Sequence, residues 1–415
     1  MITSTMSTDL ILTLILLILS LDFLLERTLD ILNRENWSAS IPKELEGIYD
    51  EEKYAQSQAY EKDKNRIGLL SSILGFVITI LMIVCGGFAW LDDFVRQYFS
   101  NPIALALSFF ALIMLGSSII SLPFSYYSTF VIEEKYGFNR STLKTFILDK
   151  IKGALLTAVL GGGILALIIW IYTLTTVNFW WMAWALIALF MIFMSMFYSS
   201  LIVPLFNKQS PLEEGELNTA ISKLAKKVGF KLDNIYVMDG SKRSSKGNAY
   251  FSGLGSRKRI VLFDTLIDEL STEEIVAVLA HEIGHYKKKH TLSSIILSLL
   301  QTGAMFYIFS LLIGNASLSE ALGAENHSFH LGLIAFGILY SPISTFLGLG
   351  MNVLSRKNEY EADAFAAEHH SAEALGNGLK KLSVSSLSNL TPHPAYVFFH
   401  YSHPTLLQRL NALKG

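Results

Sequence analysis

Seven long apolar stretches constrain this chain more than any other feature of its sequence. Each is close to or above the roughly 20 predominantly apolar residues that a membrane-spanning helix needs. They cover residues 9–25, 67–91, 102–125, 153–174, 179–203, 291–313 and 329–353. Charged residues make up 16 % of the 415 residues, well below the roughly 25 % of a soluble domain. We therefore expect a mainly α-helical integral membrane protein with seven transmembrane helices.

The positive charges indicate how these helices are oriented. If the chain crosses the bilayer at every apolar stretch, 32 of its 33 Lys and Arg residues lie on one side, and Arg96 alone lies on the other. Cytoplasmic segments of membrane proteins are enriched in Lys and Arg. The pattern predicts an N-terminus outside and a C-terminus in the cytoplasm. The formal net charge of −2 gives no overall positive field, so we expect no nucleic-acid partner. The apolar spans make the lipid bilayer the expected partner.

Two large polar segments share the predicted cytoplasmic side and could form one split domain. The stretch 248–267, NAYFSGLGSRKRIVLFDTLI, has the pattern of a strand, a glycine-containing turn and a second strand. We predict a split domain that carries a small β-sheet. The resulting division is 1–203 for five spans and their loops, 204–290 for the first part of the split domain, 291–353 for spans six and seven, and 354–415 for the second part.

The most specific motif lies at the end of the first polar segment, in VLAHEIGHYKKKH (278–290). On a helix, His281 and His285 share one face and can bind the same ion. Glu282 lies beside them and can polarise a water molecule without being a ligand. This pattern is typical of zinc peptidases, in which zinc lowers the pKa of water to about 7.

The local sequence places this motif on a helix. Ser271 and Glu274 have the spacing of a capping box, which predicts a helix that begins near residue 272. No strong stop signal precedes Thr291, so this helix is expected to continue into the sixth span.

A third metal ligand must come from another segment, because catalytic zinc usually has three protein ligands. Cys85 is the single cysteine, which excludes a cysteine cluster. In the second polar segment, Glu359 and Asp363 lie four residues apart on one helical face. We predict Glu359 as the third ligand and Asp363 as a partner that orients a ligand histidine. The alternatives in the same segment are Glu361, Glu368, His369 and His370.

In combination, several segments resemble the integral-membrane CAAX prenyl proteases, the a-factor converting enzymes. They are the metal motif, 248–267, NEYEADAFA (358–366), HYSHPTLLQRLNAL (400–413) and FVIEEKYGFNRSTLKTFILDKIKG (130–153). The resemblance covers nearly the whole chain. It implies a zinc metalloendopeptidase with one Zn²⁺ per chain and a zincin-like (gluzincin) domain. It also implies that the seven helices ring a water-filled chamber.

The resemblance also implies roles for individual residues. The zinc ligands match His281, His285 and Glu359, the catalytic glutamate matches Glu282, and the supporting aspartate matches Asp363.

Three further residues match positions in or near the family's active site. Asn248 matches a residue that faces the substrate backbone, and His403 and Arg409 match a late-chain active-site pair. An edge strand that includes Asn248, Ala249 and Tyr250 could bind an extended peptide by strand addition. His403 could donate a hydrogen bond to a developing oxyanion, with Arg409 holding His403 or a carboxylate.

For three other histidines the sequence indicates different roles or positions. His393 is an alternative to His403, because each precedes a proline. His290 also resembles a family position, but we expect a structural histidine. We expect His330 at the membrane interface.

These patterns predict cleavage of prenylated CAAX-type C-terminal peptides, possible partners being farnesylated peptides or other membrane-protein substrates. One alternative is a quality-control metalloprotease that resembles the heat-shock membrane protease HtpX. A second is a metal transporter or channel, although the motif lies outside the spans and the chain lacks the repeats of many transporters. The short loop 314–328 favours a protein of a bacterial inner membrane over a eukaryotic one of the endoplasmic reticulum.

Overall fold

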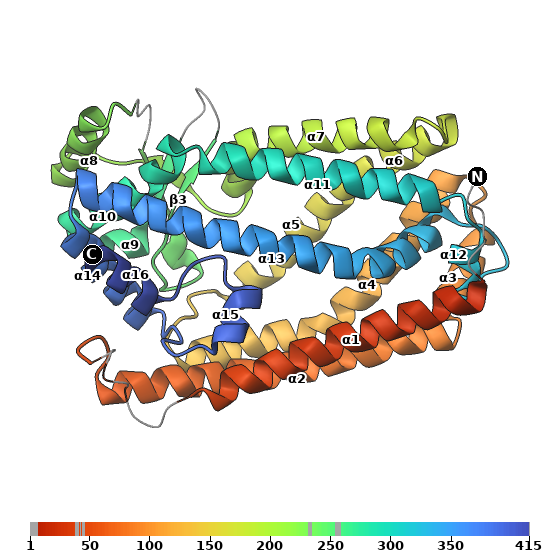
Figure 1. Ribbon diagram of the computed structural model, residues 1–415, viewed down its shortest axis with the longest axis horizontal. Coiled ribbons are helices and arrows are strands. Elements are labelled where there is room, and N and C mark those ends of the chain that lie inside the picture. The colour runs from red at the N-terminus through yellow and green to blue at the C-terminus, as the bar shows by residue number, and fades with distance from the viewer. Residues whose placement is uncertain are drawn as a thin grey trace.

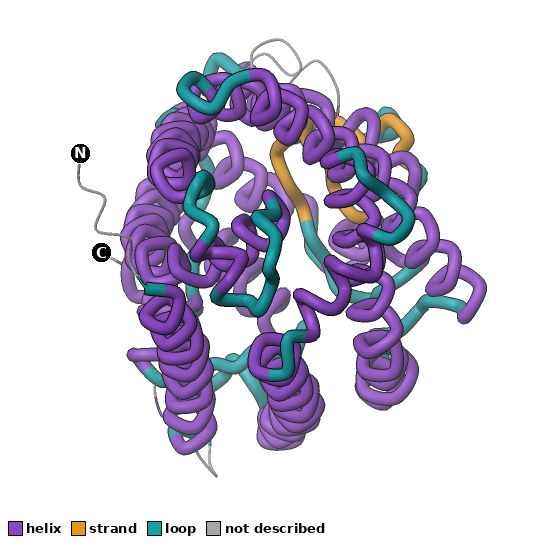
Figure 2. The backbone as a smooth tube through the Cα atoms, turned by 90° about the vertical axis from the view of Figure 1, so that its right-hand side faces the viewer, coloured by secondary structure: helices purple, strands orange, loops and turns teal. Residues whose placement is uncertain are grey.

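The computed structural model describes residues 7–37, 41, 43, 46–230, 235–253 and 259–414. Within these residues the protein is mainly helical, with seven helices long and apolar enough to cross a membrane. The expected fold class is therefore confirmed in its helical content and its seven spans. In Figure 1 the long helices run along the molecule, with the N-terminus at one end. Figure 2 looks along them from that end and shows the helices around the periphery.

The first five spans begin and end as follows. They are α1 (Thr8–Glu35), α2 (Glu51–Val84), α4 (Pro102–Tyr127) with its π-helical extension Ser128–Glu133, α5 (Leu143–Leu156) joined through Thr157–Gly161 to α6 (Gly162–Leu174), and α7 (Phe179–Phe197) with Tyr198–Ile202 and Val203–Leu205. A short helix, α3 (Gly87–Arg96), follows α2. The second span ends at Val84 and not at residue 91 as expected. The reason is that Gly86 adopts a left-handed conformation with φ of 67° and separates α2 from α3.

The two remaining spans are α11 (His290–Leu312) and α13 (Phe329–His369). The short helix α12 (Ser317–Glu320) lies between them. α13 is one helix of 41 residues, so the expected boundary between residues 353 and 354 lies within it. The N-terminal part of α13 is fixed by a buried polar cluster in which His330 Nε2 lies 2.7 Å from Asp92 Oδ1 and Arg96 Nε donates to Asp92 Oδ2 at 2.8 Å. His330 is only 1 % exposed, so it is buried in the protein at the start of span seven, and its expected position at the membrane interface stays a prediction.

A small sheet and the remaining helices occupy the other end of the bundle, which we call the sheet end. The strands are β1 (Gln209–Pro211), β2 (Ile235–Met238), β3 (Ala249–Ser252) and β4 (Arg259–Phe263), in the order β1-β2-β4-β3. β2 and β4 are parallel, and the two outer pairs are antiparallel. The helices are α8 (Glu216–Lys227), α9 (Asp264–Glu269), α10 (Thr272–Lys287), α14 (Ala372–Ser385), α15 (Pro394–His400) and α16 (Leu406–Lys414). The predicted sheet is confirmed.

Two local expectations for this region are wrong, and one lies partly outside the described residues. The second strand ends at Phe263, because Asp264 begins α9 and its carboxylate accepts hydrogen bonds from the backbone N–H groups of Ser241 and Thr265. The motif helix does not continue into the sixth span, because it ends at Lys287 and Lys289 is left-handed with φ of 62°. The predicted turn at 254–258 lies outside the described residues.

The two polar segments share one hydrophobic core. Ile275 and Ala280 of α10 belong to the same buried cluster as Phe365 of α13 and Leu375 of α14. The core therefore joins residues before span six to residues after span seven. α10 starts with the predicted capping box, in which Ser271 and Glu274 each bond the other's backbone. This fixed start and the shared core hold the metal motif against α13.

Candidate metal centre

Helix α10 packs against α13 (Figure 1), and three side chains able to bind a metal ion meet between the two helices. One nitrogen each of His281 and His285 and one oxygen of Glu359 lie within 4.8 Å of one another. The two Nε2 atoms are 3.1 Å apart. Glu359 Oε2 lies 3.4 Å from His281 Nε2, and Oε1 lies 3.2 Å from His285 Nε2. The structure thus brings the three sequence-predicted ligands together from two helices.

The environment of this cluster fits a bound cation. Glu359 is 3 % exposed, and its Oε2 is buried without a hydrogen-bond donor among the described residues. A buried carboxylate oxygen without a partner is costly, and a metal ion at the centre would satisfy it. Two imidazole nitrogens and one carboxylate form a donor set found at catalytic zinc sites. The residues present therefore fit a divalent metal ion.

Asp363 and Arg409 support this cluster from behind. Asp363 Oδ1 lies 2.8 Å from His281 Nδ1, so it fixes the ring with Nε2 facing the other ligands. Arg409, from α16, donates to both Asp363 oxygens, at 2.6 and 2.8 Å. Burial alone would lower the pKa of His281, but the neighbouring carboxylates of Asp363 and Glu359 outweigh it and raise that pKa to about 9. Arg409 thus contacts a carboxylate, one of its two expected partners.

A second supporting contact was not predicted from the sequence. His290 Nδ1 lies 3.0 Å from His285 Nδ1, and His290 Nε2 lies 3.2 Å from Glu361 Oε2. His290 is buried and both its ring nitrogens have polar partners, as expected of a structural histidine, and one of these partners is the second histidine of the motif. The left-handed turn at Lys289 brings His290 back toward α10, and the helical periodicity of the sequence gave no signal for such a turn.

The alternative ligands lie outside the cluster. Glu361 faces His290. His369 Nδ1 lies 3.0 Å from the Phe365 carbonyl oxygen and 3.9 Å from Glu368. His370 Nε2 lies 3.0 Å from a carbonyl oxygen of α10. Among the described residues, none of these four joins the two motif histidines.

Two residues with expected catalytic roles border the cluster. Glu282 follows His281 on α10 and is half-buried. His403 is 62 % exposed, and its Nε2 lies 3.3 Å from Glu359 Oε1. The alternative, His393, lies at the start of α15, where its Nδ1 accepts a hydrogen bond from the Ala395 N–H at 3.2 Å. His393 is therefore a helix cap, whereas His403 is next to a candidate ligand.

The expected peptide-binding strand is an edge strand. β3 pairs with β4 on one side, and no strand in the described part of the chain pairs with its other side. Asn248 is exposed, and its carbonyl oxygen accepts from the Phe263 N–H at 3.0 Å. Ala249 pairs with Leu262. The Tyr250 hydroxyl lies 3.2 Å from Ser199 Oγ at the end of span five, so the strand is tied to the membrane region.

Comparisons with known proteins bear on both halves of the chain. Residues 31–208 match a family model described as CAAX prenyl protease N-terminal, five membrane helices. Residues 211–415 match the model of peptidase family M48. Together the two models cover spans two to seven and the three candidate metal ligands.

Curated relatives match over most of their length. The CAAX prenyl protease 1 homolog of Arabidopsis thaliana is 38 % identical, with 91 % of each chain covered. CAAX prenyl protease 1 of Saccharomyces cerevisiae is 36 % identical, covering 90 % of this chain and 88 % of the relative. The Homo sapiens homolog is 34 % identical with the same coverage. Because these eukaryotic relatives are matched almost end to end, the argument from short loops for a bacterial protein does not hold.

A solved structure agrees with the arrangement of the elements. The crystal structure of S. mikatae Ste24p superposes with a TM-score of 0.93 at 35 % sequence identity, covering 98 % of this chain and 99 % of that one. The spans, the sheet end and the metal cluster therefore belong to one shared fold.

Proposed function

This chain belongs to the CAAX prenyl protease family, within peptidase family M48, and is a membrane metalloprotease; from that premise we propose that it removes C-terminal peptides from prenylated CAAX-type proteins, using one zinc ion per chain. The observation that carries the proposal is the cluster of His281, His285 and Glu359. Membership of a protease family argues against the alternative of a metal transporter or channel.

In the proposed site, His281, His285 and Glu359 hold the metal, and Asp363 and Arg409 keep His281 in position. When bound, zinc supplies Lewis acidity, which lowers the pKa of water and polarises a peptide carbonyl group. The buried bond between Asp363 and His281 fixes the side of the ring that is free to bind. Asp363 also needs a positive partner in this buried place, and Arg409 provides it.

Glu282 and His403 perform the proton and charge steps in this proposal. Glu282 takes the proton of the attacking water and transfers it to the departing amine. His403 donates a hydrogen bond to the carbonyl oxygen as negative charge develops on it. Its exposure and its 3.3 Å approach to Glu359 suit a group at the substrate-facing side of the cluster.

The substrate backbone lies along β3 in this proposal. An extended peptide adds to the free edge formed by Asn248, Ala249 and Tyr250, and backbone hydrogen bonds hold it with little selection for side chains. The prenyl group remains with the membrane, because lipidation contributes roughly 0.8 kcal/mol per buried CH₂. The seven helices enclose a water-filled chamber that supplies the water consumed by hydrolysis.

We place the protein in the membrane of the endoplasmic reticulum, with the sheet end in the cytoplasm. The eukaryotic relatives support this compartment, and the distribution of Lys and Arg supports the orientation. In this arrangement, the split catalytic domain formed by 204–290 and 354–415 meets prenylated proteins on their own side of the membrane.

The test is mass spectrometry of a farnesylated CAAX peptide incubated with the purified, zinc-loaded protein in lipid. The expected product lacks the last three residues. Glu282→Gln should lower turnover by at least about a thousandfold while zinc stays bound, because Glu282 acts on water and not on the metal. Glu273→Gln is the matched control, since Glu273 is an exposed carboxylate of the same helix.

Two outcomes would change the assignment. Loss of zinc from Glu282→Gln would make Glu282 a ligand. Cleavage of unfolded membrane proteins without cleavage of the farnesylated peptide would favour the quality-control alternative resembling HtpX.

A further inference from the structure

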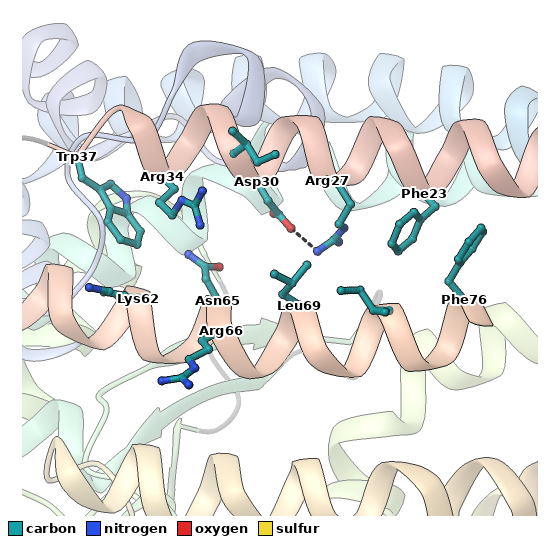
Figure 3. A pocket seen from close by; sticks show the side chains of 12 residues that line it. Phe23, Arg27, Asp30, Arg34, Trp37, Lys62, Asn65, Arg66, Leu69 and Phe76 are labelled. Carbon is teal, nitrogen blue, oxygen red and sulfur yellow. Dashed lines mark ion pairs between the residues drawn. The ribbon is translucent and has the colours of Figure 1, made fainter. Parts of the chain in front are cut away.

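A cavity of about 650 Å³ lies between α1 and α2, away from the metal cluster, and Figure 3 shows the side chains that line it. At one end the rings of Phe23 and Phe76 stack with centroids 4.2 Å apart. Leu69 and Ile73 of α2 continue this apolar lining toward the middle. We call this cavity the α1–α2 groove; its size is within the range of pockets that bind small ligands.

The opposite end of the groove is basic. Arg34, Lys62 and Arg66 line it, whereas Arg27 lies between the two ends, with its guanidinium carbon 5.5 Å from the centroid of the Phe23 ring (Figure 3). Asp30 is the one carboxylate among the lining residues. Arg27 Nη1 pairs with Asp30 Oδ2 at 2.7 Å, but its Nε is buried without a hydrogen-bond partner in the described part of the chain. The other three cations are exposed and form no ion pair with any described carboxylate. The lining of the groove therefore has a net charge of about +3, from four cations and Asp30, and one unsatisfied buried donor.

The polarity of the groove follows the direction of the bilayer normal. Both helices that form it are candidate membrane spans. The basic end lies toward the sheet end, because Asn33 and Asn36 near the end of α1 bond the chain at residues 391–393. Trp37 borders the groove at this level, where tryptophan is typical of the membrane interface. The aromatic end is about three helical turns deeper along α1.

We propose that the α1–α2 groove binds one anionic glycerophospholipid, with its phosphate at the basic end and an acyl chain along the aromatic end. Basic pockets between transmembrane helices are suited to acidic lipid headgroups, and guanidinium groups bind phosphate oxygens through paired hydrogen bonds. The unsatisfied Arg27 Nε gains an acceptor. If the sheet end faces the cytoplasm, as the proposed function requires, this lipid belongs to the cytoplasmic leaflet. Binding of the lipid itself does not depend on that orientation.

The groove suits a lipid better than a free anion or a peptide. Free phosphate would leave the apolar half unoccupied, and three of the four cations are exposed to water, which screens them. A lipid supplies both the charge and the chain. Each Lys or Arg near an anionic headgroup changes binding by about fivefold, so neutralising Arg34, Lys62 and Arg66 together should weaken it by roughly a hundredfold.

Native mass spectrometry of the delipidated full-length protein in detergent tests the proposal. The probes are dioleoyl phosphatidylglycerol and dioleoyl phosphatidylcholine, which share acyl chains and differ in charge. We expect one phosphatidylglycerol per chain, bound at least about tenfold more tightly than phosphatidylcholine. The variant Arg34→Gln/Lys62→Gln/Arg66→Gln should lose this preference. Millimolar inorganic phosphate should not displace the lipid from the wild type, which separates a lipid site from a free-phosphate site.

A second variant controls for net charge. Lys208→Gln/Lys223→Gln/Lys226→Gln removes three exposed positive charges, one from the residue before β1 and two from α8, and it should keep the wild-type preference. If the groove variant melts at a lower temperature without lipid, Arg66→Gln alone serves in its place, with an expected loss of about fivefold.

Three results would overturn the proposal. They are equal binding of the two lipids by the wild type, equal losses in the groove and control variants, and displacement of the lipid by a farnesylated peptide. The last would assign the groove to the substrate. Peptide cleavage is measured separately, so failure of the proposed protease function would leave the lipid result unaffected.

Discussion

Replacing Gly284 by alanine should weaken the metal site although Gly284 binds nothing. Gly284 lies between the two motif histidines on α10 and is buried against α13. A Cβ atom at this position would lie 3.1 Å from Phe365 Cβ, 3.2 Å from Ala362 Cα and 3.3 Å from the Ala362 carbonyl oxygen. Ordinary carbon contacts are about 3.5–4.0 Å. Two of these neighbours are backbone atoms, so the helices themselves must separate, by about 0.5 Å.

The expected effect on stability is small because two terms oppose each other. Overpacking of this kind costs about 1–3 kcal/mol, and alanine favours a helix over glycine by about 1 kcal/mol. The effect on metal binding should be larger. Metal–ligand distances tolerate about 0.2 Å, and Glu359 lies on α13 less than one turn from Ala362. We expect zinc affinity to fall by about 10- to 100-fold, as when supporting residues of metal sites are changed.

Competition with a chelator of known affinity measures this change, and thermal unfolding without zinc measures the stability term. Gly153→Ala is the matched control, because a Cβ atom there meets nothing within 4 Å on helix α5. It should leave zinc affinity unchanged. Wild-type zinc affinity in Gly284→Ala would show that the helix spacing does not set the ligand geometry, and would refute the reasoning.

Three further predictions concern proton release on metal binding, the buried polar cluster around Asp92, and the orientation of the protein in the membrane. The His281 pKa of about 9 means that the imidazole is protonated at pH 7 before metal binds. Zinc binding should therefore release about one proton, and zinc affinity should rise up to about tenfold per pH unit from pH 7 to 9. Calorimetry in buffers of different ionisation enthalpy measures the proton release, and the absence of any release would contradict the prediction. Asp92→Asn should destabilise the protein by roughly 3 kcal/mol, because it leaves buried partners uncompensated; an unchanged melting temperature would count against this. In a Cys85→Ala background, a cysteine at Ser210 should react with impermeant reagents only from the cytoplasmic side and one at Asn326 only from the other; labelling of both from one side would exclude the seven-span topology.

Local patterns predicted much of this structure. The seven spans depend on length and apolar content, which a single stretch of sequence displays. The start of α10 depends on Ser271 and Glu274, which are three residues apart. The choice of Glu359 over Glu361 depended on helical geometry and on the family resemblance, and the structure places Glu359 beside the motif histidines and Glu361 beside His290.

Features decided by distant contacts could not be predicted in the same way. Asp92 and His330 are 238 residues apart, so the sequence gave no indication that they pair and are buried. The end of α10 depends on Lys289, a non-glycine residue in a left-handed conformation. Such a conformation is unfavourable by itself and here accompanies the contacts of His290. The α1–α2 groove likewise requires two helices to be placed side by side.

The length of helix α13 limits how far from the bilayer the metal site, and therefore peptide cleavage, can lie. Thirty residues of it separate Phe329, where it begins, from Glu359, a rise of about 45 Å. The hydrocarbon core of a bilayer is about 30 Å thick, which leaves the metal cluster no more than roughly 15 Å beyond it. An extended peptide spans that distance with about five residues, at roughly 3.3 Å each. A scissile bond a few residues from a lipid anchor can reach the metal site, whereas a bond far from the membrane must first move toward the membrane. The length of α13 therefore predicts that bonds are selected by their distance from the bilayer, before any side chain of the substrate is recognised.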